Sequence, residues 1–209
     1  ADQLMPPLVP KIRREVQTWR ESGYKGATKT SRALLVWWFD TEHVIEASDG
    51  SLSSFRYYFS QREAVETAIW LHDVQQVKDK HDLLRFDSSQ RLSLSHFQET
   101  WPRYVLKLAT GAGKTKVLSL LIAWCYFHKL YEPDSTLARN ILLIAPNIIV
   151  LDRLRADFDG LKIFFNDPIL PENGLDGKNW RDDFQLRRRR ARPTTTRPTW
   201  DESSEKSMN

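Results

Sequence analysis

The segment LATGAGKT at residues 108–115 is the feature that most constrains how this chain folds. It follows the apolar run RYVLKLA at 103–109 and opens into KTKVLSLLIAWCYFHKL at 114–130, which is apolar on nearly every face. The first run predicts a buried strand, and the second predicts a helix that packs tightly against a sheet. NILLIAP at 140–146 predicts a second buried strand. This order of elements predicts a βαβ unit, and with it an α/β fold that contains a parallel sheet.

The glycine loop itself has the composition of a phosphate-binding turn. Gly111 and Gly113 permit backbone conformations in which successive N–H groups point inward, and the following helix start adds unpaired donors. Gly113, Lys114 and Thr115 match the end of the pattern G-x-x-x-x-G-K-[ST], but Leu108 stands where its first glycine falls. The sequence therefore predicts that Lys114 reaches the β and γ phosphates of ATP and that the Thr115 hydroxyl binds Mg²⁺. The alternative is a glycine turn that binds nothing.

Helical periodicity dominates the chain before this loop. Residues 11–23 have apolar side chains at helical spacing, and residues 32–39 predict a second helix, capped by Thr30 or Ser31. A long helix is predicted from about residue 61 to about residue 77.

Three regions follow from these patterns: a helical N-terminal region at 1–54, an incomplete nucleotide-binding domain at 55–186 and a basic tail at 187–209. The tail has few apolar residues and no periodicity, so it is expected to be disordered. The whole chain has 31 Lys and Arg against 27 Asp and Glu, a net charge of only +4, but arginines gather near the C-terminus. A flexible arginine-rich tail would bind nucleic acid through its phosphates, and a solvated tail without function is the alternative.

Cysteine content and apolar run length argue for a cytoplasmic protein that does not enter a membrane. Cys125 is the single cysteine, and its apolar surroundings predict a small buried thiol in a reducing compartment. The longest nearly uninterrupted apolar run, at 117–127, is shorter than the roughly 20 residues that span a bilayer. Charged residues at 11–15 interrupt any secretory signal.

Three stretches together resemble a known family: FRYYFSQREAVETAIWL, then LKLATGAGKTKVLSLLIAW, then ILLIAPNIIVLDRLRADF. In this order they are similar to the first half of the motor domain of superfamily 2 DEAD/DEAH helicases. They look most like the restriction-enzyme helicase subunits, namely the type III Res subunit and UvrB-like proteins. The resemblance covers about residues 31–185. It implies a partial RecA-like domain that binds ATP and Mg²⁺ and acts on DNA, with a modification (methyltransferase) subunit or a second copy at an open sheet edge as partner.

The resemblance also implies roles for individual residues. Gln61 would read adenine through its amide, which donates and accepts at once, and Phe59 would stack on the base; an exposed glutamine and a core phenylalanine are the alternatives. Pro146 and Asn147 would contact the backbone of a bound nucleic acid strand, with simple helix capping as the alternative. The phosphate loop would consist of Thr110, Gly111, Ala112, Gly113, Lys114 and Thr115.

Hydrolysis in such motors needs an acidic pair after a third strand and arginines from a second RecA-like domain. Asp40 and Glu42 precede the loop at the end of a predicted helix, and Asp201 and Glu202 follow no apolar strand. The catalytic residues are therefore unidentified, and the chain is expected to bind ATP with little hydrolysis. The abrupt change to RRRRARPTTTRPTW at 187–200 suggests a truncated or frame-shifted product.

Overall fold

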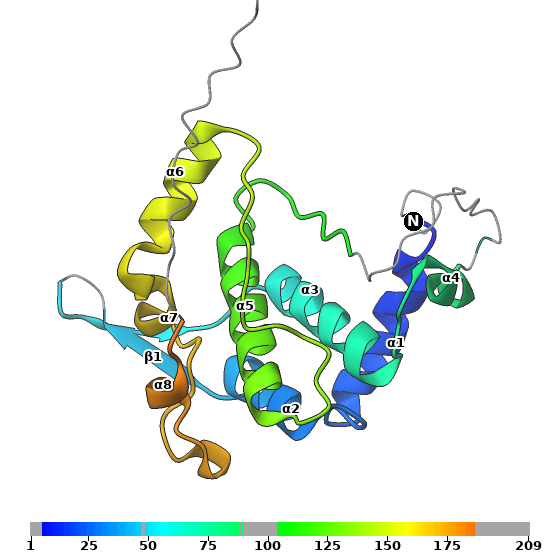
Figure 1. Ribbon diagram of the computed structural model, residues 1–209, viewed down its shortest axis with the longest axis horizontal. Helices are drawn as coiled ribbons and strands as arrows, with labels where there is room; N and C mark the ends of the chain where they lie inside the picture. Colours follow the sequence, from blue (N-terminus) through cyan, green and yellow to red (C-terminus); the bar gives the residue numbers. More distant parts are fainter. Residues whose placement is uncertain (1–5, 47–48, 88, 90–103, 187–209) are drawn as a thin grey trace, which may run out of the picture.

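The computed structural model describes residues 6–46, 49–87, 89 and 104–186, and helices make up most of their regular structure (Figure 1). Two short strands, β1 (His43–Glu46) and β2 (Leu52–Phe55), form an antiparallel pair that projects from one side of the helical body. The turn between them contains Asp49 and Gly50, a dipeptide that favours tight hairpins. This hairpin was not predicted from the sequence.

The core lies between four long helices: α1 (Val9–Glu21), α2 (Lys29–Phe39), α3 (Phe59–Ile69) and α5 (Lys114–Tyr131). Helices α1, α2 and α5 all pack against α3. Helix α5 is apolar all round, as its sequence predicts, and buries residues on several faces because it lies in the middle of this group. Side chains from before and after residue 54 contribute to one hydrophobic core.

The predicted N-terminal helices are present, with one change at a helix start. Val16 and Trp19 of α1 are buried on one face, as their spacing predicts. Helix α2 begins one turn earlier than predicted, because Thr28 is its N-cap and its hydroxyl accepts a hydrogen bond from the Ser31 N–H at 3.2 Å. Thr30 and Ser31 therefore lie inside the first turn, and neither is the cap.

The predicted long helix ends differently from a regular α-helix. After α3 the chain continues without a break into a π-helical turn, η2 (Trp70–Val74). Here the Gln75 N–H donates to the Trp70 carbonyl at 2.9 Å, a five-residue step.

The two segments predicted to form a parallel sheet form no strand in the part of the chain that the structure describes. Residues 104–109 and 140–146 have no regular secondary structure, and Leu142 and Ile144 are each 82% exposed. Parallel strands of this apolar kind are stable when other elements cover both faces of their sheet. No other described segment pairs with residues 104–109 or 140–146. Helix α6 (Ile148–Asp157), which follows, has no buried residue and lies at the edge of the molecule (Figure 1).

Short helical pieces complete the described chain. Residues 162–166 form a short helix, and residues 80–83 form a single helical turn. None of the described helices has the length and apolar character to cross a membrane. Cys125 is largely buried, and this burial raises the pKa of its thiol to about 11, as expected for an unreactive cysteine. The short helical elements of the described chain are α4 (Lys80–Leu83), η3 (Leu84–Phe86), η4 (Asp159–Leu161), α7 (Lys162–Asn166), η5 (Leu175–Gly177) and α8 (Trp180–Asp183).

Candidate nucleotide-binding site

The predicted phosphate loop forms a tight turn at the N-terminus of α5. Gly111 and Gly113 have φ angles of +81° and +75°, a left-handed conformation that other residues adopt at a cost. Gly113 is the N-cap residue, and its carbonyl accepts from the N–H groups of Lys116 and Val117 at 3.0 and 3.3 Å. The N–H groups of Lys114 and Thr115, in the first turn, have no helix carbonyl to bond, so the helix start presents donors and a positive dipole end to any bound anion.

The mouth of this loop is exposed, and a lysine lies across it. The Lys114 ammonium donates to the Ala109 carbonyl at 2.8 Å, and the Ala112 N–H donates to the same oxygen at 3.3 Å. Thr110 and Gly111 are exposed, whereas Thr115 is half-buried in the first turn of α5. Lys114 and the loop are therefore both accessible to solvent.

Gln61 is brought to the loop from 51 residues away in sequence. Its amide nitrogen donates to the Ala112 carbonyl at 3.0 Å, and its amide oxygen accepts from the Tyr58 N–H at 2.9 Å. The side chain is only 3% exposed, so the alternative of an exposed glutamine is wrong. In this conformation the amide joins the start of α3 to the phosphate loop.

Gly113 has no room for a side chain. A Cβ atom at this position would lie 2.2 Å from the amide nitrogen of Gln61, which is held by hydrogen bonds at both ends. We expect Gly113→Ala to lower the free energy of unfolding by more than about 2 kcal/mol, because the left-handed backbone costs roughly 1–2 kcal/mol and the close contact with Gln61 adds to this cost. Urea denaturation followed by tryptophan fluorescence measures this loss.

Gly111→Ala is the matched control for Gly113→Ala. Gly111 has the same left-handed backbone, but a Cβ atom added to it would meet no atom of the described residues within 4 Å. Gly111→Ala should therefore show the backbone cost alone. Equal losses in the two variants would mean that the contact with Gln61 does not restrict the loop.

A further group of side chains around Lys116, in the first turn of α5, was not foreseen from the sequence. The Lys116 ammonium pairs with the Asp167 carboxylate and lies 5.4 Å from the Phe55 ring centroid. The Tyr57 hydroxyl is buried without a hydrogen-bond partner among the described residues. Burial, and then the charge of Asp167, raise the pKa of Tyr57 well above its ordinary value. No spacing or motif links residues so far apart, so the sequence held no signal for this group.

Phe59 and the start of α6 are both exposed. Phe59 is 62% exposed, so the alternative of a core phenylalanine is wrong, and the Arg20 guanidinium lies 5.7 Å from its ring centroid. Pro146 and Asn147 are also on the surface. The Asn147 side chain caps α6 by accepting from the Val150 N–H at 3.0 Å, which confirms the predicted cap. Contact between these two residues and a nucleic acid strand stays a prediction.

Asp40, the first residue of the acidic segment before the loop, is engaged at a helix end. It follows the last residue of α2, and its carboxylate accepts a hydrogen bond from Arg62 at 2.9 Å. This pairing agrees with the interpretation of the segment as a surface helix end. Asp201 and Glu202 lie outside the described residues, as does the whole arginine-rich tail.

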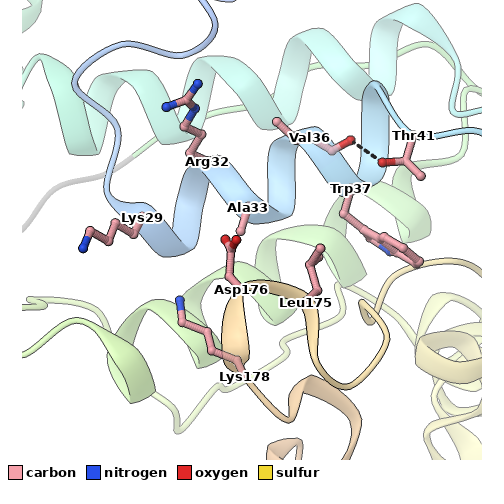
Figure 2. A pocket seen from close by; sticks show the side chains of 9 residues that line it. All are labelled: Lys29, Arg32, Ala33, Val36, Trp37, Thr41, Leu175, Asp176 and Lys178. Atoms are coloured by element: carbon pink, nitrogen blue, oxygen red, sulfur yellow. Dashed lines mark hydrogen bonds between the residues drawn. The ribbon is translucent and has the colours of Figure 1, made fainter.

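A separate cleft of about 520 Å³ lies between α2 and the turn at Leu175–Gly177 (Figure 2). Lys178 and Asp176 project from the turn toward α2, where Lys29 and Arg32 lie. Lys178 donates to the Thr30 hydroxyl at 3.1 Å, and burial lowers its pKa. The lining residues include none from the phosphate loop, so this cleft is distinct from the nucleotide site.

The family model for the type III restriction enzyme, res subunit, matches residues 54–192. The chain belongs to this family. The matched region contains α3 with Gln61, the phosphate loop, α5 and α6, and it thus includes every residue of the candidate site. It relates the chain to helicase-like, ATP-dependent enzymes that act on DNA in restriction systems. Searches of curated proteins and of solved structures find no match.

Proposed function

We propose that this chain binds ATP with Mg²⁺ at residues 110–115 and forms the nucleotide-binding part of a restriction-type DNA helicase or translocase. The observation that carries the proposal is the turn at the start of α5, where two left-handed glycines, unpaired helix N–H groups and the Lys114 ammonium lie together in one solvent-accessible turn. Such a turn suits a phosphate chain because the donors are preformed and because, among the described residues, no carboxylate pairs with the Lys114 ammonium.

Each side chain at the loop has a place in this proposal. Lys114 would exchange the Ala109 carbonyl for phosphate oxygens, and the Thr115 hydroxyl would bind Mg²⁺. Gln61 would hold the loop in shape while using the remaining donor and acceptor capacity of its amide for adenine. Phe59, exposed two residues earlier, would stack on the base.

The proposal extends to the sheet and to the partners. We infer that residues 104–109 and 140–146 become parallel strands of a RecA-like domain when further strands cover them, since Leu142 and Ile144 are otherwise exposed to water. Pro146 and Asn147 would then lie at a strand end, where DNA phosphates would meet the start of α6. A modification subunit, or a second copy at the sheet edge, would be the protein partner. Nucleic acid binding by the tail at 187–209 is the alternative function, and it lies outside the described residues.

Lys114→Ala tests the proposal directly. The substitution removes a charged hydrogen-bond donor that contributes about 1.5–3 kcal/mol to binding, so the dissociation constant for ATP–Mg²⁺ should rise roughly 10- to 100-fold. Titration of the purified chain with a fluorescent ATP analogue measures the change.

Lys107→Ala is the control, because Lys107 is an exposed lysine in the segment that leads into the loop. Its affinity for the analogue should equal that of the unchanged chain. The proposal fails if the unchanged chain shows no saturable binding, or if Lys114→Ala and Lys107→Ala bind equally well.

A further inference from the structure

A second group of chemistry-bearing side chains lies at the opposite end of α5 from the phosphate loop. His72 and Asp73 come from the π turn after α3, and His128 comes from the last turns of α5. One side-chain N or O atom from each lies within 4.8 Å of the other two. His128 is 14 residues along α5 from Lys114, a distance of roughly 20 Å along the helix. The group is therefore separate from the nucleotide site.

The π turn explains how two successive residues contribute to one group. In a regular helix, neighbours in sequence diverge around the axis, and one of them faces away. The wider turn at Trp70–Val74 places His72 and Asp73 together, with His72 Nδ1 2.8 Å from Asp73 Oδ1. Such π turns are rare in helices and are often found at functional sites.

The inner atoms of the group face one another. Asp73 Oδ1 lies 2.8 Å from His72 Nδ1 and 3.4 Å from His128 Nε2. His128 is only 3% exposed, and its Nε2 makes no hydrogen bond within the described chain, because Asp73 Oδ1 at 3.4 Å lies within ion-pair distance but outside hydrogen-bond geometry. An unpaired buried nitrogen costs free energy, so this atom points to a missing partner.

The outer atoms of both imidazoles are occupied by hydroxyl groups. His72 Nε2 lies 3.1 Å from Thr136 Oγ1, and His128 Nδ1 lies 2.6 Å from Ser135 Oγ. Each ring can therefore donate its proton outward and keep a lone pair on the nitrogen that faces Asp73. Metal-binding histidines in proteins have this arrangement, in which a second hydrogen bond fixes the ring.

The carboxylate is likewise held by its outer oxygen. Asp73 Oδ2 accepts from the N–H and from the hydroxyl of Thr28, each at 3.1 Å. These two bonds fix the carboxylate so that Oδ1 is directed at the two imidazoles.

We propose that His72 Nδ1, Asp73 Oδ1 and His128 Nε2 bind a Zn²⁺ ion. Zinc bonds of about 2.0–2.2 Å in tetrahedral geometry separate ligand atoms by roughly 3.3–3.6 Å. The Asp73–His128 separation of 3.4 Å lies within this range, whereas the Asp73–His72 separation of 2.8 Å is shorter and would widen on metal binding. The His72 side chain is 19% exposed, so water could reach the fourth coordination position of the ion from the His72 side of the group. The ion would satisfy the unpaired nitrogen of His128 and join the end of α3 to α5.

Cobalt binding tests the proposal, because tetrahedral Co²⁺ absorbs visible light and occupies zinc sites. The full chain, free of any histidine tag and treated with a chelator, is titrated with Co²⁺ and then with Zn²⁺. We expect one equivalent of Co²⁺ to give the tetrahedral spectrum and Zn²⁺ to displace it. Asp73→Asn and His128→Gln should each weaken binding at least tenfold, and Ser135→Ala should weaken it roughly tenfold while all three ligands stay in place.

His81→Gln is the control, since His81 is an exposed histidine outside the group. It should bind Co²⁺ like the unchanged chain. The proposal is overturned if the unchanged chain gives no tetrahedral spectrum, or if the ligand variants and His81→Gln bind equally. Should His128→Gln fail to fold, His72→Gln and Ser135→Ala decide the matter, because neither residue belongs to the hydrophobic core.

Discussion

Glu66→Gln is expected to lower the free energy of unfolding by about 3 kcal/mol, since it removes the buried negative charge that pairs with Arg20 and Arg62. Glu66 is fully buried in α3. Its Oε1 accepts from the Tyr24 hydroxyl at 2.8 Å and from Arg62 Nε at 2.7 Å, while Oε2 accepts from Arg20 Nε at 2.9 Å. Breaking a buried pair by removing one charge typically costs 3–5 kcal/mol, and the partly exposed arginines place this case at the lower end.

Glu63→Gln is the matched control in the same helix. Glu63 pairs with Arg13 near the surface, where an ion pair contributes about 0–1 kcal/mol. Urea denaturation of both variants at neutral pH gives the comparison. Similar midpoints for Glu63→Gln and Glu66→Gln would mean that the buried carboxylate adds no net stability.

The Glu66 group matters for the nucleotide site because it fixes α3 against two other helices. Arg20 belongs to α1, and Arg62 also donates to the carbonyl of Phe39 at the end of α2 at 3.2 Å. Gln61, next to Arg62, joins the same helix to the phosphate loop. Loss of Glu66 should therefore loosen the support of the loop as well as the core.

The helices could be predicted from the sequence because their signals are local. The apolar face of α1, the all-round apolar character of α5 and the Asn147 cap of α6 each depend on residues within a few turns. The hairpin β1–β2 was missed because its strands are only four residues long. The two apolar runs at 104–109 and 140–146 show the limit of local signals, since a strand exists only when another segment pairs with it.

The candidate site was predicted in part, for a related reason. The loop was evident from its glycines, and the resemblance to helicases predicted that Gln61 belongs to the same site. The hydrogen bond from the Gln61 side-chain amide to the Ala112 carbonyl follows from neither spacing nor composition. The pairing of His128 with His72 and Asp73 depends on a π turn, which has no periodic signature. Contacts between distant segments thus account for most of what the sequence did not predict.

Phe127→Ala is expected to have an equally large effect, lowering the free energy of unfolding by about 3–5 kcal/mol. Phe127 is fully buried in the C-terminal half of α5, with ring centroids of Trp180 at 4.9 Å and Phe184 at 5.6 Å. The cavity left by its ring would separate α5 from the segment that ends in α8, and α5 carries the phosphate loop at its other end.

The control for Phe127→Ala is Phe165→Ala, because Phe165 is 47% exposed and lies at the edge of the same aromatic cluster, 6.3 Å from the Phe184 ring centroid. Its loss should cost less than about 1 kcal/mol, since little apolar area leaves the core. Urea midpoints, together with binding of the ATP analogue at low temperature, separate the two roles of α5. If Phe127→Ala unfolds at much lower urea yet binds the analogue normally while folded, the aromatic cluster stabilises α5 without shaping the loop. If Phe127→Ala and Phe165→Ala have the same urea midpoint, the packing of Phe127 against Trp180 of α8 does not stabilise the core.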